Sequence, residues 1–256
     1  MEAASGRPGA ELWNALSDPA PDRARLRLAS MVERRRAGEP LQYVMGEWSF
    51  RRLDLMVDAR VLIPRPETEV VVEVALGELR RATSPRRVVD LGTGSGAIAL
   101  SLAAEGPPAE VWATDISDDA LAVASANLAG LGGAAAARVR LVRGSWYDAL
   151  PAELAGELAL IVSNPPYVAH SDRVEPEVET WEPEIALRSG PTGQEATEAI
   201  LAQAGRWLRP AGSVVLEMAS ERADQTAVVA ESHGFETSVH CDLSGRPRVL
   251  VGRVRA

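Results

Sequence analysis

The segment VVDLGTGSG, residues 88–96, decides the fold that this chain is predicted to adopt. Its first four residues are mostly apolar and β-branched, so they predict a buried strand, and three alternate glycines follow. Alternate glycines let the backbone turn sharply and let a ligand approach it closely. Because residues 97–104 are apolar and Ala-rich, we expect a strand, a tight turn and a helix, the opening unit of a parallel α/β sheet.

Strands and helices continue to alternate after this unit. We predict further strands at 111–115, 139–142, 158–163 and 213–218, helices at 68–81, 117–130, 194–208 and 224–232, and a closing hairpin at 235–241 and 248–254. This order favours a parallel sheet covered by helices on both faces. We therefore predict a doubly wound, Rossmann-like α/β domain over residues 67–256.

The residues before this domain follow other patterns. Residues 1–40 are rich in Ala and Arg and place Leu12 and Leu16 at helical spacing. Prolines interrupt the pattern near residue 20, so we predict a small N-terminal domain of two short helices, the second ending near Arg36. Residues 41–66 contain alternating apolar positions and predict a linking hairpin.

Composition excludes several classes of protein. The chain has 256 residues, of which 46% are hydrophobic, enough for one sizeable domain with a small appendage. A net charge of -9 argues against a protein whose main task is to grip a phosphate backbone. We see neither an apolar run of transmembrane length nor a secretory leader, and therefore expect a cytoplasmic protein. The single cysteine, Cys241, excludes an internal disulfide, and three scattered histidines predict no metal site.

The glycine segment at 92–96 predicts a nucleoside cofactor. Its Gly-x-Gly-x-Gly spacing differs from that of dinucleotide sites, and the Lys-Ser/Thr pair of phosphate-binding loops is missing. Asp115 ends the next strand, where a carboxylate can accept hydrogen bonds from two ribose hydroxyls. The alternative is that Asp115 only caps the following helix. A nucleoside without a pyrophosphate suits the pattern best, and S-adenosylmethionine is the obvious one.

The tetrapeptide Asn164-Pro165-Pro166-Tyr167 closes the strand predicted at 158–163. Each proline lacks an N–H and holds φ at about -65°, so the loop is stiff. The Asn164 amide and nearby backbone carbonyl groups remain to accept hydrogen bonds from a planar –NH2, and Tyr167 can lie against the flat face of that group. The alternative is a Pro-rich turn in which Tyr167 is ordinary packing.

Ligands of open parallel sheets bind outside the carboxyl ends of the strands, where the strand order reverses. The glycine segment and Asn164 should therefore meet there, so that a methyl donor faces a held –NH2. The segment at 170–192 is polar and broken by prolines, and its length favours a lid or substrate loop over a linker.

With both loops considered, the chain resembles the class I S-adenosylmethionine-dependent methyltransferases that act on exocyclic or amide nitrogens. Residues 39–46, 62–69, 181–187 and 242–249 look like the PrmC/HemK family. That family methylates N5 of the glutamine in the Gly-Gly-Gln motif of peptide chain release factors. The resemblance covers about residues 35–254. It implies a seven-stranded sheet whose last strands are antiparallel, and a helical N-terminal domain that helps dock the release factor.

The resemblance also implies roles for single residues. Gly92 to Gly96 would hold the methionine part of the cofactor and Asp115 the ribose, while Trp146 would pack beside the adenine. Asn164 and the Pro165 carbonyl would bind the glutamine amide. The predicted cofactor-binding residues are Asp90, Gly92, Thr93, Gly94, Ser95, Gly96, Asp115, Trp146 and Asn164. The predicted catalytic residues are Asn164, Pro165 and Tyr167, and Pro166 joins them in binding the substrate.

Two other functions remain open at this stage. An adenine-N6 or other nucleic-acid amino methyltransferase would use an Asn-Pro-Pro-Tyr loop in the same way. Such an enzyme needs a basic domain to recognise nucleic acid, and the net charge of -9 argues against one. The other open function is that of a non-catalytic assembly partner that keeps the cofactor-binding fold. The intact glycine and Asn-Pro-Pro-Tyr loops argue against this function. We expect a monomer that acts on a release factor and binds neither nucleic acid stably nor a membrane.

Overall fold

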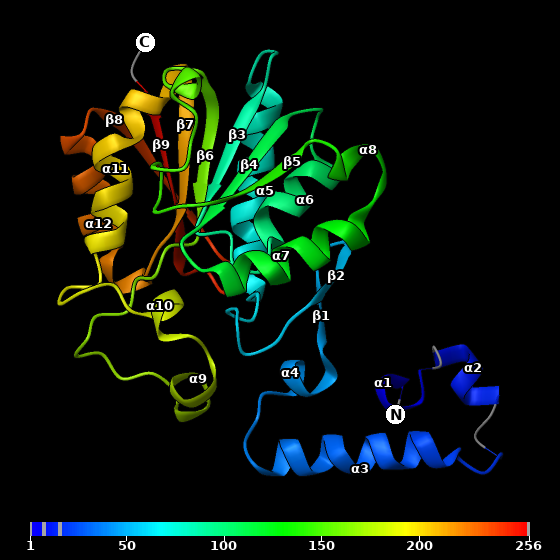
Figure 1. Ribbon diagram of the computed structural model, residues 1–256. Helices are drawn as coiled ribbons and strands as arrows, with labels where there is room; N and C mark the ends of the chain where they lie inside the picture. The colour runs from blue at the N-terminus through cyan, green and yellow to red at the C-terminus, as the bar shows by residue number, and fades with distance from the viewer. Residues whose placement is uncertain (1, 7–8, 15–16, 255–256) are drawn as a thin grey trace.

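The strand predicted at 88–91 is an inner strand of a seven-stranded sheet (Figure 1). The computed structural model describes residues 2–6, 9–14 and 17–254. Its main sheet contains β3 (Arg87–Leu91), β4 (Glu110–Asp115), β5 (Val139–Arg143), β6 (Leu158–Ser163), β7 (Leu208–Glu217), β8 (Phe235–Cys241) and β9 (Pro247–Val254). The strand order is β5-β4-β3-β6-β7-β9-β8. Strands β3 to β7 pair in parallel, whereas β9 pairs antiparallel with β7 and β8, which confirms the predicted sheet.

Helices cover both faces of this sheet. They are α5 (Pro66–Arg81), α6 (Ala97–Glu105), α7 (Asp118–Leu131), α8 (Gly133–Ala136), α11 (Glu195–Trp207) and α12 (Ala223–Ser232), with 3-10 turns at Ala152–Leu154 and Ser220–Arg222. Successive strand residues point to opposite faces. Val88 and Leu160 accordingly pack with α5 and α6, while Val89 and Ile161 pack with α11 and α12. Both faces of β6 are buried, as its uninterrupted apolar sequence predicts.

The N-terminal region consists of α1 (Glu2–Ser5), α2 (Gly9–Asn14), α3 (Asp22–Arg36) and α4 (Leu41–Met45), followed by the β1 (Glu47–Phe50) and β2 (Leu53–Met56) hairpin. The hairpin and the end of α3 at Arg36 confirm the predictions. The prediction of one helix before α3 is wrong, because two short helices are described there, and Leu16 lies outside the described residues. Helix α4 was not predicted. The domain boundaries near residues 40 and 66 stay a prediction.

The linking region packs against the sheet domain through a small hydrophobic cluster of its own. Tyr43, Val57 and Ile63 are buried there with Ala120 and Val123 of α7. The Tyr43 hydroxyl also donates to the Val61 carbonyl at 2.6 Å. These contacts fix the 57–63 segment beside the carboxyl ends of the strands, where α7 begins.

Two segments differ from the sequence prediction. Strand β7 begins at Leu208, five residues before the predicted start at residue 213, so the Pro-Ala-Gly sequence at 210–212 lies inside it. Its pairing with β6 shifts register between Leu158 and Leu160, and Ala211 has φ 60°. The extra residues form a bulge that local turn chemistry cannot distinguish from a reversal of the backbone. The second segment is 170–192, which was predicted as a loop. It contains the short helices α9 (Pro176–Trp181) and α10 (Glu184–Leu187).

Among the residues that the structure describes, every helix is too short or too polar to cross a membrane. Within the same residues, His, Cys, Asp and Glu side chains form no group of three or more that could hold a metal ion.

Candidate active site

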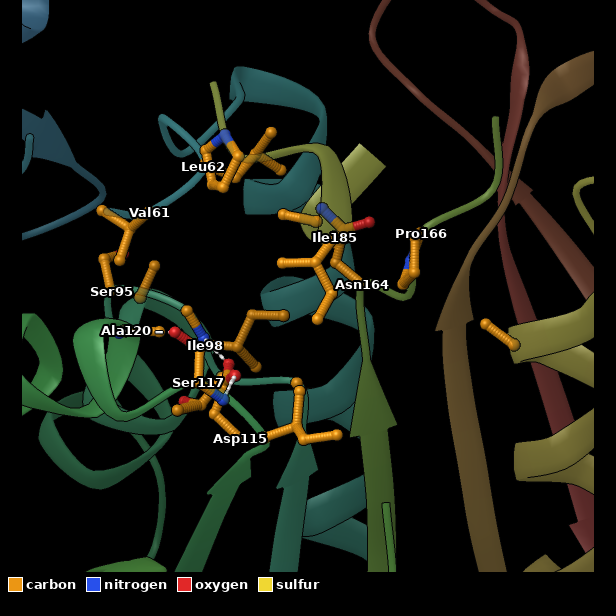
Figure 2. A pocket seen from close by; sticks show the side chains of 18 of the residues that line it. Val61, Leu62, Ser95, Ile98, Asp115, Ser117, Ala120, Asn164, Pro166 and Ile185 are labelled. Atoms are coloured by element: carbon orange, nitrogen blue, oxygen red, sulfur yellow. Dashed lines mark hydrogen bonds between the residues drawn. The ribbon is translucent and has the colours of Figure 1, made fainter. Parts of the chain in front are cut away.

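A cavity of about 440 Å³ lies at the carboxyl ends of β3, β4, β5 and β6. The segments after these strands form its floor, and residues 60–64 and α10 contribute further wall (Figure 2). Connections leave β3 and β6 in opposite directions across the sheet, so the cavity occupies the point where the strand order reverses. This is where an open parallel sheet binds its ligand, as predicted from the sequence.

The glycine loop after β3 forms one side of the cavity. Gly92 has φ 72° and Gly94 has φ 55°, a backbone conformation that costs a side-chain-bearing residue free energy. The amides of Gly92 and Thr93 both donate to the Thr114 carbonyl at 2.9 Å. A Cβ atom on Gly94 would meet nothing within 4 Å, so the missing side chain leaves open space at the cavity wall.

Asp90 supports the glycine loop from inside the protein. Its Oδ2 accepts hydrogen bonds from Thr93 Oγ1 at 2.6 Å and from the Ala99 amide at 3.2 Å. Among the described residues, none forms a hydrogen bond with Asp90 Oδ1. Complete burial is the main reason that the pKa of Asp90 rises to about 7, because desolvation disfavours the charged form. Asp90 therefore holds the loop in shape.

Asp115, at the end of β4, faces the cavity directly. Its Oδ2 accepts from the Gly94 amide at 2.9 Å, and its Oδ1 accepts from the Ser117 amide at 2.9 Å. Burial raises the pKa of this carboxyl, and the backbone donors oppose the rise. Ser117 itself caps α7 by accepting from the Ala120 amide at 3.2 Å. Each carboxylate oxygen can accept a second hydrogen bond, so Asp115 retains acceptor capacity toward the cavity.

Trp146 contributes an apolar part of the wall. Its backbone has φ 47°, and its carbonyl accepts from Thr114 Oγ1 at 3.1 Å. Its ring lies close to the glycine loop, since a Cβ atom on Gly92 would be 3.5 Å from Trp146 Cζ3. Ile116 lines the same cavity and is 51% exposed. These two side chains offer the kind of surface that the flat face of a base requires.

The loop after β6 brings Asn164 and Pro166 to the opposite side of the cavity, as Figure 2 shows. Asn164 Nδ2 donates to Thr68 Oγ1 at 3.2 Å. The Tyr167 hydroxyl points elsewhere and donates to Glu217 Oε1 at 3.3 Å. Stacking of Tyr167 on a bound amide stays a prediction.

Most of the predicted site residues converge on this cavity. Its wall includes Gly92, Thr93, Gly94, Ser95, Asp115, Trp146, Asn164 and Pro166. Of the other predicted residues, all in the described part of the protein, Asp90, Gly96, Pro165 and Tyr167 adjoin wall residues without belonging to the wall.

Sequence reasoning missed Thr68 and Glu217. Thr68 was treated only as part of a helix start, yet it lines the cavity and donates to Glu217 Oε2 at 2.7 Å. Glu217 is 1% exposed at the end of β7. An acid at the end of a predicted strand was the available signal, and it is the same signal that identified Asp115.

The 170–192 segment covers the cavity on the remaining side, with Ile185, Ala186 and Arg188 in the wall. The buried Glu182 carboxylate anchors it by accepting from the Ile63 amide at 3.1 Å and by pairing with Arg65. This position suits a lid or substrate loop. Its movement stays a prediction.

Fold and site together define a class I methyltransferase: a sheet of this order, with a glycine loop after β3 and an acid ending β4. Solved structures with the same fold include a methyltransferase from Pyrococcus furiosus, which is 17% identical with a TM-score of 0.58 over 89% of this chain and 97% of that one. Another is a ribosomal protein L11 methylase from Lactobacillus delbrueckii subsp. bulgaricus, 21% identical with a TM-score of 0.53 over 76% of this chain and 82% of that one.

Sequence comparison narrows the class to one family. The family models of the PrmC N-terminal domain and the methyltransferase small domain match residues 1–46 and 71–180. The release factor glutamine methyltransferase of Deinococcus radiodurans is 43% identical over 90% of this chain and 80% of that protein. The Cereibacter sphaeroides protein of the same name is 41% identical over 94% and 84%. The chain belongs to the release factor glutamine methyltransferase family.

Proposed function

We propose that this protein transfers the methyl group of S-adenosylmethionine to the side-chain amide N5 of the glutamine in the Gly-Gly-Gln motif of peptide chain release factors. Family membership supports the reaction class, and the position of Asn164 at the cavity carries the choice of an amide acceptor. A release factor as partner implies a cytoplasmic enzyme. Adenine-N6 methylation and a non-catalytic role are the outcomes that the test below must exclude.

The residues around the cavity fit S-adenosylmethionine. The space beside Gly94 is one that a Cβ atom would fill, and the glycine loop from Gly92 to Gly96 would hold the methionine part there. Asp115 would accept from the ribose hydroxyls, and Trp146 would lie beside the adenine. When bound, S-adenosylmethionine supplies an electrophilic methyl group on a positively charged sulfonium.

An amide nitrogen is a weak nucleophile because its lone pair is delocalised into the carbonyl. We assign Asn164 Oδ1 to accept one N–H of the glutamine amide and the Pro165 carbonyl to accept the other. Two such bonds hold the nitrogen in line and stabilise the positive charge that develops on it. Proton loss follows transfer, since an N-alkylated, protonated amide is a strong acid.

Methyl transfer to a purified release factor tests the proposal. Labelled S-adenosylmethionine is incubated with the wild-type factor, with a copy whose Gly-Gly-Gln glutamine is changed to glutamate, and with duplex DNA and ribosomal RNA as competitors. We expect label on the wild-type factor alone. Label only on nucleic acid would show an adenine or similar acceptor, and no label on any of them would favour the non-catalytic role.

The variant Asn164→Ala tests the assigned role of the cavity asparagine. Turnover should fall about 10²-fold or more, the scale for removing one preorganised polar group, while the Kd for S-adenosylmethionine stays within about twofold. Gln225→Ala is the matched control, because the Gln225 amide is exposed on α12, outside the cavity and the N-terminal helices. An equal loss of cofactor binding in Asn164→Ala would contradict the role.

We assign docking of the release factor to the N-terminal helices. Trp13 on α2 is 76% exposed and Leu26 on α3 is 73% exposed, large apolar side chains of the kind that mark protein-binding surfaces. Leu26→Ser should raise KM for the release factor and leave the Kd for S-adenosylmethionine unchanged. An unchanged KM would exclude Leu26 from the docking surface.

A further inference from the structure

A series of hydrogen bonds runs from Asn164 at the cavity wall to the fully buried Glu217. Asn164 Nδ2 donates to Thr68 Oγ1 at 3.2 Å, and Thr68 Oγ1 donates to Glu217 Oε2 at 2.7 Å. Thr68 is 4% exposed in the first turn of α5, and Glu217 is 1% exposed at the end of β7. Three elements far apart in the sequence thus meet behind the cavity asparagine, and we call these three residues the orienting triad.

The triad has a direction that follows from the number of protons. An ionised carboxylate only accepts hydrogen bonds, and a hydroxyl has a single proton to donate. Since Thr68 gives that proton to Glu217, its oxygen is left to accept, and only the NH2 end of Asn164 can donate to it. The opposite amide orientation would place Asn164 Oδ1 against a threonine oxygen with no proton to give. Ionised Glu217 therefore turns Asn164 Oδ1 toward the cavity.

Charged and titratable groups from each packed element act on Glu217. Arg248 on β9 favours its ionised form, and Tyr167 from the loop after β6 donates to its other oxygen. Glu67 on α5 opposes ionisation by like charge. Burial is the largest influence and raises the pKa of Glu217 to about 7. Arg248 is held in turn beside Asp242, with 3.5 Å between Arg248 Nε and Asp242 Oδ2.

We infer that Glu217, acting through Thr68, is a positioning residue that decides which end of the Asn164 amide faces the methyl acceptor. The identity of that acceptor rests on the proposed function. With Oδ1 outward, Asn164 accepts from a substrate NH2. With its own NH2 outward, two donors would face each other. Protonated Glu217 no longer imposes the order, because a proton on Oε2 can be donated to Thr68.

The orientation can be observed without any substrate, by NMR of the side-chain amides in the 15N-labelled full-length protein. Asn14, Asn127 and Asn164 are its three asparagines, and loss of one signal pair in Asn164→Asp assigns the third. We expect the Asn164 Nδ2 signals to shift as Glu217 titrates. The shift should vanish in Thr68→Val and in Glu217→Gln, and persist in Thr68→Ser. Signals that ignore pH in the wild type, or that still titrate in Thr68→Val, would overturn the inference.

Kinetics provide the second readout. Thr68→Val should lower kcat about tenfold or more, a loss expected for a misoriented reacting group, and leave the Kd for S-adenosylmethionine within about twofold. Wild-type kcat should decline as pH falls through the titration of Glu217. That acid limb should vanish in Thr68→Val, whereas a threonine that only packs the helix would leave it intact. Thr68→Ser should retain the wild-type kcat and its decline at acid pH. Thr83→Val, a control at an exposed site, should have the kcat and pH profile of the wild type.

The two proposals fail in different ways. A wild-type protein that methylates no release factor would contradict the proposed function, yet the amide titration would still test the orienting triad. An active wild type whose Thr68→Val variant keeps kcat and the acid limb would contradict the orienting triad alone.

Discussion

Replacing Asn127 by alanine should destabilise the protein far more than an exposed substitution on the same helix. Asn127 lies on α7 and is 7% exposed. Its Oδ1 accepts from the Met56 amide at 2.7 Å, and its Nδ2 donates to the carbonyls of Met56 at 3.1 Å and of Ser95 at 2.9 Å. One side chain thus pairs with the edge of β2 and ties it to the glycine loop.

The magnitude follows from the three backbone groups that lose a partner. Each hydrogen bond contributes about 0.5–1.5 kcal/mol net, so Asn127→Ala should lower the free energy of unfolding by about 2–4 kcal/mol. For a protein of this size, each kcal/mol corresponds to about 2–4 °C in Tm, which gives a fall of roughly 5–15 °C. Differential scanning calorimetry measures it. Ser125→Ala, exposed on the same helix, should change stability by less than about 0.5 kcal/mol.

A loss below about 1 kcal/mol in Asn127→Ala would refute this reasoning, because it would mean that water replaces all three bonds at little cost. The Ser95 bond adds a functional consequence. Loss of that bond frees part of the glycine loop, so the Kd for S-adenosylmethionine should rise in Asn127→Ala and stay constant in Ser125→Ala.

Three further predictions concern buried or strained positions. The pKa of Asp90 is raised to about 7, so its stabilising contribution is complete below its unfolded pKa of about 3.9 and is lost as pH rises through 7. The Tm of Asp90→Asn relative to that of the wild type should therefore increase from about pH 5 to about pH 8. A Tm difference that stays constant over this range would contradict the prediction. Gly94→Ala should cost about 1 kcal/mol at φ 55° and weaken S-adenosylmethionine binding about tenfold by calorimetry, since its methyl group enters the cavity. Glu182→Gln should lower the free energy of unfolding by about 1–2 kcal/mol, less than for a fully buried ion pair because Arg65 is partly exposed. The variant should also be cleaved faster by proteases within residues 170–192, and an unchanged cleavage rate would exclude Glu182 as the anchor.

Local sequence patterns predicted the elements whose boundaries are decided locally. Strand β6 begins and ends at the predicted residues, because an apolar run closed by Ser163 stops at Asn164-Pro165. Helix α7 begins within one residue of the predicted position 117, because Ser117 caps it. The start of β7 was not predictable in this way, since residues 210–212 have turn chemistry and are held in the sheet only by pairing with β6 on both sides of a bulge.

The site was predictable to the extent that sheet topology brings strand ends together. Asp115, the glycine loop and Asn164 each follow a strand, and the rule for parallel sheets places them at one cavity. Thr68 and Glu217 are separated by 149 residues, and Thr68 and Asn164 by 96. No local pattern predicts which helix-start hydroxyl will lie between a strand-end acid and a loop amide, because their contact depends on how α5 packs over the finished sheet.

Three acids at the carboxyl edge of the sheet share one physical role. Asp90 accepts from Thr93, Asp115 from the Gly94 amide, and Glu217 from Thr68. When ionised, each carboxylate accepts a hydrogen bond from a donor of the adjoining segment and so fixes which atoms that segment presents. Asp115 keeps lone pairs toward the cavity, and the orienting triad turns Asn164 Oδ1 the same way. These acceptors suit ligand groups that are donors or cations, such as ribose hydroxyls, a sulfonium and a primary amide, while Arg60 and Arg188 place donors in the same wall.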